Sequence, residues 1–236
     1  SSIGQDLSLL DDAVATVGGQ LTVAGDGAGS DVGVVGALTI TGGGRLIGDT
    51  GVATGGAVSV LATGTLQGAA NVASGGDLTV ASGGSVTGPV DLASGATGDL
   101  NGTVTGSLTN GGTLDLRGTV TGALLTEAGG DTQVDGALLT GSTVVNSGTM
   151  VVQDPATLTL SGGNVLQTRD GATTTIAGTV TGSVTDQVNG AGFGTTALTG
   201  GVITGGATLD GQFSNTGTSS IGQDLSLLDD AVATVG

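Results

Sequence analysis

The stretch VATGGAVSV at residues 52–60 returns as VASGGDLTV at residues 72–80 and as LASGATGDL at residues 92–100. Each copy begins with an apolar residue, a small residue and Ser or Thr, and then passes through glycine into alternating apolar and polar residues. Alternation with a period of two is the pattern of a half-buried β-strand, and glycine suits a tight turn. Less regular copies occupy residues 14–23 and 108–116. The stretch therefore predicts short strands joined by turns, with a spacing of 20 residues between its three best copies.

A second motif, Gly-x-apolar-x-Gly, alternates with the first along the chain. Its spacing is nearly regular and shortens slightly toward the later copies. Self-similarity at such a period is the signature of a solenoid built from one small unit per repeat. The two motifs together predict a coil of 16–20 residues that contains two or three short strands. The copies lie at residues 44–48, 64–68, 84–88, 102–106 and 118–122.

These coils predict the fold class. We expect equivalent residues of successive coils to stack about 4.8 Å apart, as neighbouring strands of one sheet do. Val52, Val72 and Leu92 would then form one internal ladder. The sequence predicts an all-β chain that forms a parallel β-helix, or β-solenoid, which is right-handed and has about twelve coils of 16–20 residues. The apolar residues of segment 3–14 have helical spacing, but the end of that segment aligns with the other coils, which favours strand or loop.

A much longer repeat encloses the short one. Residues 1–18, SSIGQDLSLLDDAVATVG, are identical to residues 219–236, so that Ser1 returns as Ser219. An identity of this length indicates a tandem array, in which residues 1–218 are one period and residues 219–236 begin the next. We expect residues 1–236 to form a single continuous solenoid. The partner would be the chain itself, end to end, as the next covalent period or as a neighbouring subunit, with lateral fibre–fibre contacts as an additional option.

Composition limits the core and the partners. The 236 residues include 51 glycines and two phenylalanines, and no Trp or Tyr, so the core must be thin and filled by aliphatic side chains. Three Lys and Arg residues face 20 acidic residues, giving a net charge of −17. This charge argues against nucleic acid, whose binding depends on basic side chains, and against anionic lipid surfaces. The apolar runs are too short for a membrane span, and the absence of cysteine excludes disulfides.

Three further segments carry a resemblance to a known family. Residues 108–116, 145–152 and 213–221 each contain Asn, then Gly-Thr, then alternation. They resemble degenerate coils of the β-helical passenger regions of bacterial autotransporters and two-partner-secretion adhesins. The resemblance implies a secreted bacterial protein that is attached to the cell surface or filamentous, and it carries over no functional residue. The long period, repeated without divergence, is more typical of giant repetitive adhesins and fibre subunits.

The sequence offers little chemistry for catalysis. It contains no Cys and no His, so a Ser-His or Cys-His arrangement is excluded. Asp11 and Asp12 are adjacent, and adjacent strand residues point to opposite faces, so they are unsuitable as a pair of catalytic carboxylates. We therefore expect no enzymatic activity and no cofactor. The segment GDGAGSD at residues 25–31 resembles one copy of the calcium loop of repeats-in-toxin proteins, which makes Asp26 and Asp31 calcium candidates. The alternative is a solvated turn.

The expected function follows from the array. The sequence predicts a structural extracellular fibre or adhesin stalk, built from tandem β-solenoid repeats, that forms a stiff filament at the cell surface or in a biofilm matrix. One alternative is a ligand-binding adhesin repeat that depends on calcium or binds ice, the latter suggested by Thr-Val-Thr triplets at residues 103–105, 119–121 and 179–181. A second alternative is an intracellular filament of the bactofilin type.

Overall fold

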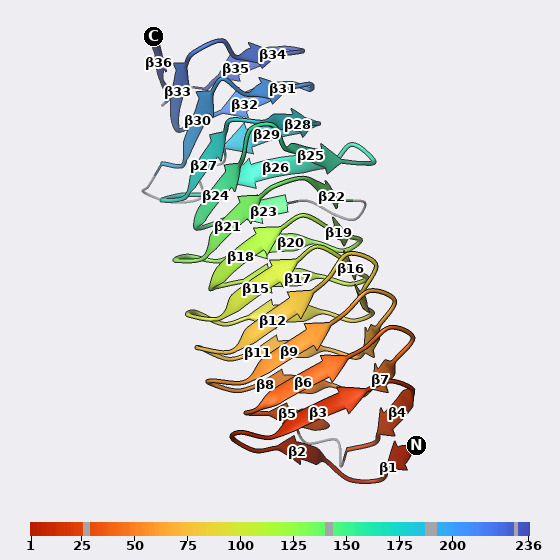
Figure 1. The fold of residues 1–236 in the computed structure, drawn as a ribbon. Helices are drawn as coiled ribbons and strands as arrows, with labels where there is room; N and C mark the ends of the chain where they lie inside the picture. Colours follow the sequence, from red (N-terminus) through yellow and green to blue (C-terminus); the bar gives the residue numbers. More distant parts are fainter. Residues whose placement is uncertain (26–28, 140–143, 187–192, 229–230) are drawn as a thin grey trace. The chain divides into compact units, whose positions relative to one another are not determined.

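The computed structural model describes residues 1–25, 29–139, 144–186, 193–228 and 231–236 (Figure 1). Over these residues it contains 36 short strands and no helix. The chain divides into two compact units, which are described separately: unit 1 is Ser1–Leu114 with Gly118–Thr121, and unit 2 is Asp115–Arg117 with Gly122–Gly236. Each coil contributes one strand to each of three parallel sheets, named A, B and C here.

Unit 1 contains the first strands of the three sheets. Figure 1 shows β3, β6, β9 and β12 of sheet C lying side by side. Sheet A contains β1 (Ser2–Ile3), β4 (Gln20–Val23), β7 (Arg45–Ile47), β10 (Thr65–Gln67), β13 (Ser85–Val86), β16 (Thr103–Val104) and β19 (Thr119–Val120). Sheet B contains β2 (Leu7–Leu9), β5 (Val32–Val34), β8 (Thr50–Val52), β11 (Ala70–Val72), β14 (Val90–Leu92) and β17 (Leu108–Asn110). Sheet C contains β3 (Val14–Val17), β6 (Ala37–Ile40), β9 (Ala57–Val60), β12 (Asp77–Val80) and β15 (Thr97–Leu100), while β18 (Thr113–Leu116) has residues in both units.

Unit 2 repeats the same arrangement. Sheet A contains β22 (Ala137–Leu139), β25 (Thr157–Leu160), β28 (Thr179–Thr181), β31 (Val202–Ile203) and β34 (Ser220–Ile221). Sheet B contains β20 (Leu124–Thr126), β23 (Val144–Asn146), β26 (Val165–Thr168), β29 (Ser183–Asp186), β32 (Ala207–Leu209) and β35 (Leu225–Leu227). Sheet C contains β21 (Asp131–Val134), β24 (Thr149–Val152), β27 (Thr173–Ile176), β30 (Thr195–Thr199), β33 (Gln212–Thr216) and β36 (Val232–Val235).

The structure confirms the predicted parallel β-solenoid. Strands of successive coils pair in parallel, and the 36 described strands, three to a coil, correspond to the expected number of about twelve coils. The ladder of Val52, Val72 and Leu92 is present in register on sheet B, and these side chains are at most 2% exposed. The alternation of buried and outward residues along each strand thus places one inward row on sheet A and two inward rows on each of sheets B and C inside the coil. The handedness stays a prediction.

The second motif forms sheet A. Leu66 pairs with Leu46 on one side and Val86 on the other, and all three side chains are fully buried. The closing glycine is required by close approach, because a Cβ atom on Gly68 would lie less than 3.0 Å from the carbonyl oxygen of Gly48 in the preceding coil. Gly68 also has a φ of 137°, which side chains rarely tolerate. The motif therefore encodes an inward apolar residue followed by a turn. Its closing glycine lets the turns of successive coils approach each other closely.

Two of the predicted alignments are wrong. Leu108 lies beside Val90, and Asn110, two residues later, lies beside Leu92. The reason is the turn between sheets B and C, which has four residues after Leu92 and only two after Asn110. Val14 lies on sheet C beside Ala37, so it does not belong to the Val52 ladder on sheet B. Turn length thus varies while the strand pairing is kept.

The duplicated segment forms the same coil twice. Residues 1–18 form β1, β2 and β3 on sheets A, B and C, and residues 219–236 form β34, β35 and β36 on the same three sheets. The first copy contains strands, as expected, and no helix. It pairs with β4, β5 and β6, whereas the second copy pairs with β31, β32 and β33. The first copy therefore pairs with the coil that follows it in the chain, and the second copy pairs with the coil that precedes it.

Candidate functional site

The predicted calcium candidates are only partly described. Asp26 lies outside the described residues. Asp31 Oδ2 accepts a hydrogen bond of 3.0 Å from the backbone N–H of Asp49, one coil further on. Asp49 Oδ1 in turn accepts one of 2.8 Å from the N–H of Ala69. Asp31 therefore belongs to a short series in which each aspartate holds the turn of the next coil.

A second carboxylate lies near Asp31. A Cβ atom on Gly25 would come within 3.0 Å of both Asp31 Oδ1 and Asp6 Oδ1, so Gly25 leaves the space into which these two carboxylates point. The sequence did not predict Asp6 there, because it precedes Asp31 by a full coil. Within the described ranges, no group of three His, Cys, Asp or Glu side chains is suited to hold a metal ion. A calcium site at Asp26 and Asp31 stays a prediction.

Asp11 and Asp12 have a local structural role in the turn before β3. Asp11 Oδ1 accepts a hydrogen bond of 3.1 Å from the backbone N–H of Asp12, in an exposed position. Asp12 has a φ of 61°, a left-handed conformation that Asp tolerates better than most residues. The two side chains fit the shape of the turn.

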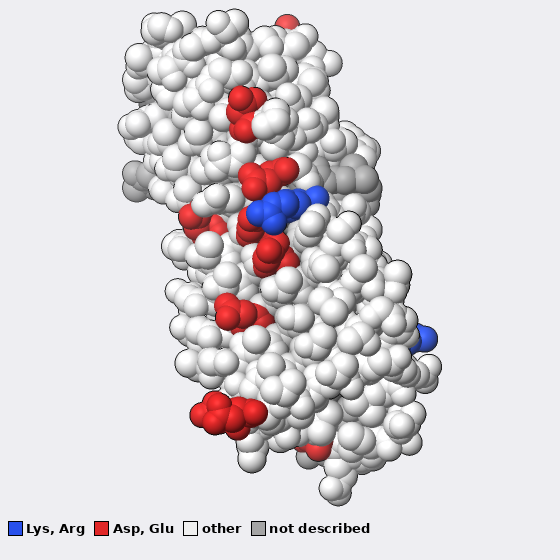
Figure 2. All heavy atoms as spheres, viewed as in Figure 1, with Lys and Arg blue, Asp and Glu red and all other residues white. Residues whose placement is uncertain are grey.

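Acidic side chains spread over the face shown in Figure 2, with few basic ones among them. Outward positions of sheet C hold Asp77 and Asp99 in unit 1 and, separately, Asp131 in unit 2.

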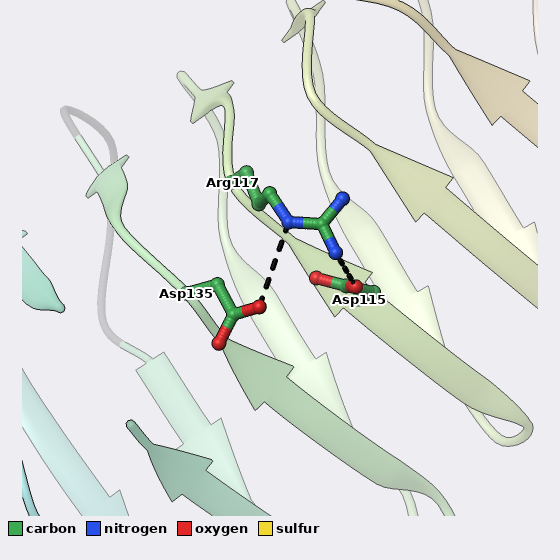
Figure 3. A network of polar contacts seen from close by, with 3 residues as sticks. All are labelled: Asp115, Arg117 and Asp135. Atoms are coloured by element: carbon green, nitrogen blue, oxygen red, sulfur yellow. Dashed lines mark hydrogen bonds and ion pairs between the residues drawn. The ribbon is translucent and has the colours of Figure 1, made fainter. Parts of the chain in front are cut away.

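Arg117 lies between two acidic residues of unit 2, Asp115 and Asp135. Its guanidinium group contacts the Asp115 carboxylate through Nη2, and its Nε lies 3.5 Å from Asp135 Oδ2 (Figure 3). The three side chains are 34–39% exposed, so solvent screens the attraction. Arg45 similarly donates a hydrogen bond to the side chain of Gln67 in the next coil. These arginines link neighbouring coils, and a partially exposed ion pair of this kind contributes at most about 1 kcal/mol.

The interior of unit 2 is polar at several positions where most coils of unit 1 are apolar; in unit 1, Asn110 is a fully buried polar residue at the end of β17. Thr126 and Thr132 are fully buried, and their hydroxyl oxygens are 2.8 Å apart in a hydrogen bond. Asn146 Nδ2 donates to the carbonyl oxygen of Thr173 at 2.8 Å and to Thr174 Oγ1 at 2.9 Å. Asn146 Oδ1 also accepts the N–H of Gly148 at 3.0 Å, which fixes the turn between sheets B and C. We call this set of residues the polar ladder.

The polar ladder continues into the following coils. Thr168 is fully buried, and its hydroxyl oxygen lies 2.7 Å from Thr174 Oγ1 and 3.4 Å from Thr196 Oγ1. Bonded hydroxyl and amide groups remove the cost of placing polar atoms in the core. The polar ladder contains Thr126, Thr132, Asn146, Thr168, Thr174, Asp186 and Thr196.

Asp186 is the exception within the polar ladder. Its side chain is 2% exposed, and neither carboxylate oxygen has a hydrogen-bond partner among the described residues. Cβ atoms on Gly194 and Gly211 would come within 3.0 Å of Oδ1 and Oδ2 respectively, so two glycines make room for this group. Burial, together with the negative charges of Asp210 and Asp170, raises the pKa of the Asp186 carboxyl from 3.8 to about 6. Asp186 is therefore a titratable group inside the coil.

An apolar groove runs over sheet B of unit 1. Its volume is about 530 Å³. Gly33 and Gly51 form its floor, where the outward positions carry no side chain, and Leu10, Val35 and Ala53 line its wall. Nothing in the structure shows what would cover it.

The sequence missed the polar ladder although its signal was present. In the triplets at residues 124–126, 144–146, 166–168 and 184–186, two positions match the apolar-x-apolar pattern of sheet B and the third is Thr, Asn or Asp. These residue types are common in turns, which is why the third position is easily assigned to the turn that follows. Asp186 could have been noticed as the acidic member of an otherwise uncharged series.

The described part of the chain contains no helix with the length and apolar character that a membrane crossing requires.

Comparisons with known proteins give a weak structural likeness. No family model matches the chain, and no curated protein sequence matches it. Among solved structures, the chain is similar to the crystal structure of a TibC-catalyzed hyper-glycosylated TibA55-350 fragment, with 19% sequence identity, a TM-score of 0.41 and coverage of 98% of each chain. At this TM-score we base no functional conclusion on the likeness.

Proposed function

We propose that this chain is a segment of an extracellular structural fibre or adhesin stalk in which β-solenoid periods, each equivalent to residues 1–218, continue end to end. The observation that carries the proposal is the duplicated coil. Residues 1–18 and 219–236 have the same sequence and form the same three strands on the same three sheets. A coil that recurs in register allows one period to follow another without a change in strand pairing.

The role is mechanical. Parallel backbone hydrogen bonds connect each coil to the next, for example 2.8 Å from the N–H of Thr50 to the carbonyl oxygen of Ala69. Each coil contacts mainly its neighbours, so stability adds up along the stack. The net charge of −17 supports a solvated filament that repels its own kind sideways and binds no nucleic acid. The extracellular location rests on the resemblance of the coils to secreted adhesin repeats.

A chain that carries the period of residues 1–218 twice tests the proposal. Hydrogen exchange is compared between this two-period chain and the chain of residues 1–236, at the residues that correspond to β34, β35 and β36. In the longer chain these strands lie between two coils, so their amides are expected to exchange more slowly. Cryo-electron microscopy of the longer chain should show an uninterrupted stack. Unchanged exchange at these strands, together with separate globular particles, would contradict the proposal.

A further inference from the structure

We propose that the outward face of sheet A in unit 1 binds ice. This face is formed by the outward side chains of β10, β13, β16 and β19, and it is called the hydroxyl array here. It lies within unit 1 and needs no contact with another period, so the inference goes beyond the proposed fibre and does not depend on it. The ligand is the surface of an ice crystal, which is neutral, ordered and rich in hydrogen-bonding groups.

Successive coils place hydroxyl groups in register in one column of the hydroxyl array. Thr65 pairs with Ser85, and Ser85 pairs with Thr103. Thr119 continues the column in the next coil. All four side chains are half-buried and outward, because the residue that follows each of them points into the core. The strand pairing therefore aligns one hydroxyl per coil over four coils.

A second column runs beside the first. Gln67 lies at its start, and the next three members are the exposed residues Thr87, Thr105 and Thr121. The backbone N–H groups of these three threonines donate to carbonyl oxygens of the preceding coil at 2.8–3.0 Å. The parallel ladder therefore also holds the second column in register.

Two of the Thr-Val-Thr triplets in the sequence contribute to the hydroxyl array. Those at residues 103–105 and 119–121 lie in adjacent coils and in register. The triplet at residues 179–181 lies on sheet A of unit 2, where Thr179 pairs with Thr157. The first two triplets therefore belong to the proposed site, and the third does not.

The spacing and stiffness of the hydroxyl array suit a crystalline surface of water. Neighbouring coils lie about 4.8 Å apart, and alternate residues of one strand lie about 6.6 Å apart. These distances are comparable with the repeat distances of oxygen atoms on a prism face of hexagonal ice. Threonine is β-branched and therefore has few side-chain conformations, and Ser85 Oγ donates to Thr65 Oγ1 at 3.2 Å. The hydroxyls are thus held in place before ice is bound, which lowers the entropy cost of binding.

Glycines border the hydroxyl array on both sides. Gly102 and Gly118 precede β16 and β19, while Gly88 and Gly106 follow β13 and β16. A Cβ atom on any of these four glycines would lie less than 3.0 Å from a carbonyl oxygen of the preceding coil. These positions therefore carry no side chain that would hold a solid surface away from the hydroxyls.

The hydroxyl array is uncharged, although the chain has a net charge of −17. The acidic residues of unit 1 within these coils are Asp77 and Asp99 on sheet C and Asp91 on sheet B. Charged side chains hold a hydration shell of their own, which does not match the order of ice. Their placement on the other two sheets therefore leaves sheet A free to contact ordered water.

A crystalline polysaccharide is the competing ligand, because its surface is also neutral and periodic. Sugar rings pack well against aromatic side chains, but the two aromatic residues of the chain, Phe193 and Phe213, belong to unit 2 and lie outside the hydroxyl array. Ice needs only hydroxyl and methyl groups at a regular spacing, and threonine supplies both. The composition of the array therefore favours ice.

Adsorption of the chain of residues 1–236 to ice tests the inference. When ice grows slowly from a protein solution, a protein that binds ice is incorporated into the crystal, whereas other proteins stay in the liquid. We expect the chain to be enriched in the ice fraction relative to serum albumin. It should also hold the freezing temperature of a seeded crystal below its melting temperature. Exclusion from ice to the same degree as albumin, or binding to insoluble cellulose without binding to ice, would overturn the inference.

Matched lysine variants locate the binding face. Thr105→Lys places a long charged side chain in the middle of the hydroxyl array, so incorporation into ice and the gap between freezing and melting temperatures should both be lost. Thr109→Lys, which is outward on sheet B in the same coil, is the control and should keep both effects. Thr87→Lys repeats the test one coil earlier, and circular dichroism shows that the variants compared are folded. Equal ice binding by the folded sheet A and sheet B variants would overturn the inference.

The experiments separate the inference from the proposed function. If the two-period chain protects the duplicated coil while the chain of residues 1–236 is excluded from ice, the fibre remains and ice binding is wrong. If the chain binds ice through sheet A while the two-period chain shows no protection, the proposed fibre fails and the ice-binding face remains.

Discussion

The two units use the same coil with different interiors. In unit 1 the inward third position of sheet B is apolar in four successive coils, at Val34, Val52, Val72 and Leu92, and becomes polar at Asn110 in the next coil. In unit 2 the same position holds members of the polar ladder in four successive coils, at Thr126, Asn146, Thr168 and Asp186, and is apolar again at Leu209. Both rows are fully or almost fully buried. The backbone of the coil therefore accommodates polar as well as apolar side chains at this buried position.

The difference shows which kind of neighbouring side chain each interior requires. Apolar side chains gain from burial against any apolar neighbour of suitable size, so rows of Val and Leu stabilise without selecting a particular partner. Buried hydroxyl and amide groups need a defined partner, because an unbonded one costs about 1–3 kcal/mol. Asn146 bonds to Thr174 of a following strand, which holds those coils in one register. We expect unit 1 to tolerate changes of size and unit 2 to resist changes of polarity.

The largest expected effect on stability comes from placing a polar side chain, of the kind found inside unit 2, at a buried apolar position of unit 1. Leu78 is 1% exposed and is paired with Val58 and Gly98, neither of which offers a hydrogen bond through its side chain. Leu78→Thr loses apolar volume and buries an unbonded hydroxyl, so it should lower the free energy of unfolding by about 3–5 kcal/mol. Urea unfolding followed by far-ultraviolet circular dichroism measures this. Thr79→Ser, outward on the same strand, is the control, and an equal effect of both variants would contradict the comparison.

The buried carboxyl of Asp186, a member of the polar ladder, is expected to make the stability of the fold depend on pH. Because burial raises the pKa of Asp186 from 3.8 to about 6, the folded protein binds this proton more tightly than the unfolded chain does. The resulting stability is present below about pH 3.8 and is lost as the pH rises through about 6, a change of roughly 3 kcal/mol. Asp186→Asn should therefore match the parent protein at pH 3.5 and exceed its stability above pH 7.

The control for this prediction is an exposed acid. Asp77→Asn changes the same net charge on the outer face of β12, where the side chain is solvated. If it reproduces the pH dependence of Asp186→Asn, the effect is one of overall charge rather than of the buried carboxyl.

A smaller effect is expected from removing one bonded member of the polar ladder. Asn146→Ala leaves the hydroxyl of Thr174 and the N–H of Gly148 without the bonds that Asn146 makes. The expected loss of stability is about 2 kcal/mol. Hydrogen exchange should show faster opening at β23 and β27, the strands that Asn146 connects. A variant as stable as the parent would mean that the hydrogen bonds add nothing to the packing.

The smallest effect belongs to the outer surface. Arg117→Ala removes contacts with Asp115 and Asp135 on side chains that are about a third exposed or more. We expect a loss below about 1 kcal/mol at low salt, which disappears in 0.5 M salt because ions screen exposed charges. A loss that persists at high salt would indicate that the arginine contributes through packing of its stem.

The regular part of the fold was predictable from local patterns. Leu46, Leu66 and Val86 follow the Gly-x-apolar-x-Gly motif, and each lies where the motif places it. The shift at Leu108 was not predictable, since it depends on a turn two residues shorter than that of the coil before. Turns absorb changes of length while strands keep their pairing, so alignment by motif fails where a turn changes.

The candidate sites were less predictable, because their partners come from other coils. The surroundings of Asp186 include Gly194 and Gly211, and nothing local to residue 186 indicates that these glycines make room for it. Asp31 was a candidate because of its glycine-rich context, yet its bond to the N–H of Asp49 links it to the next coil. Contacts between coils, rather than along the chain, decide the role of each acidic residue.

The parallel pairing of neighbouring coils has a consequence for how the chain folds. Val52 pairs with Val72 and Thr103 with Thr119, so each residue meets its partner only one coil later in the chain. Low contact order of this kind favours fast folding, because the loop closed at each step is short. A coil can therefore be added as soon as its residues emerge, without waiting for distant segments. Folding can then proceed coil by coil, starting from the end of the chain that emerges first.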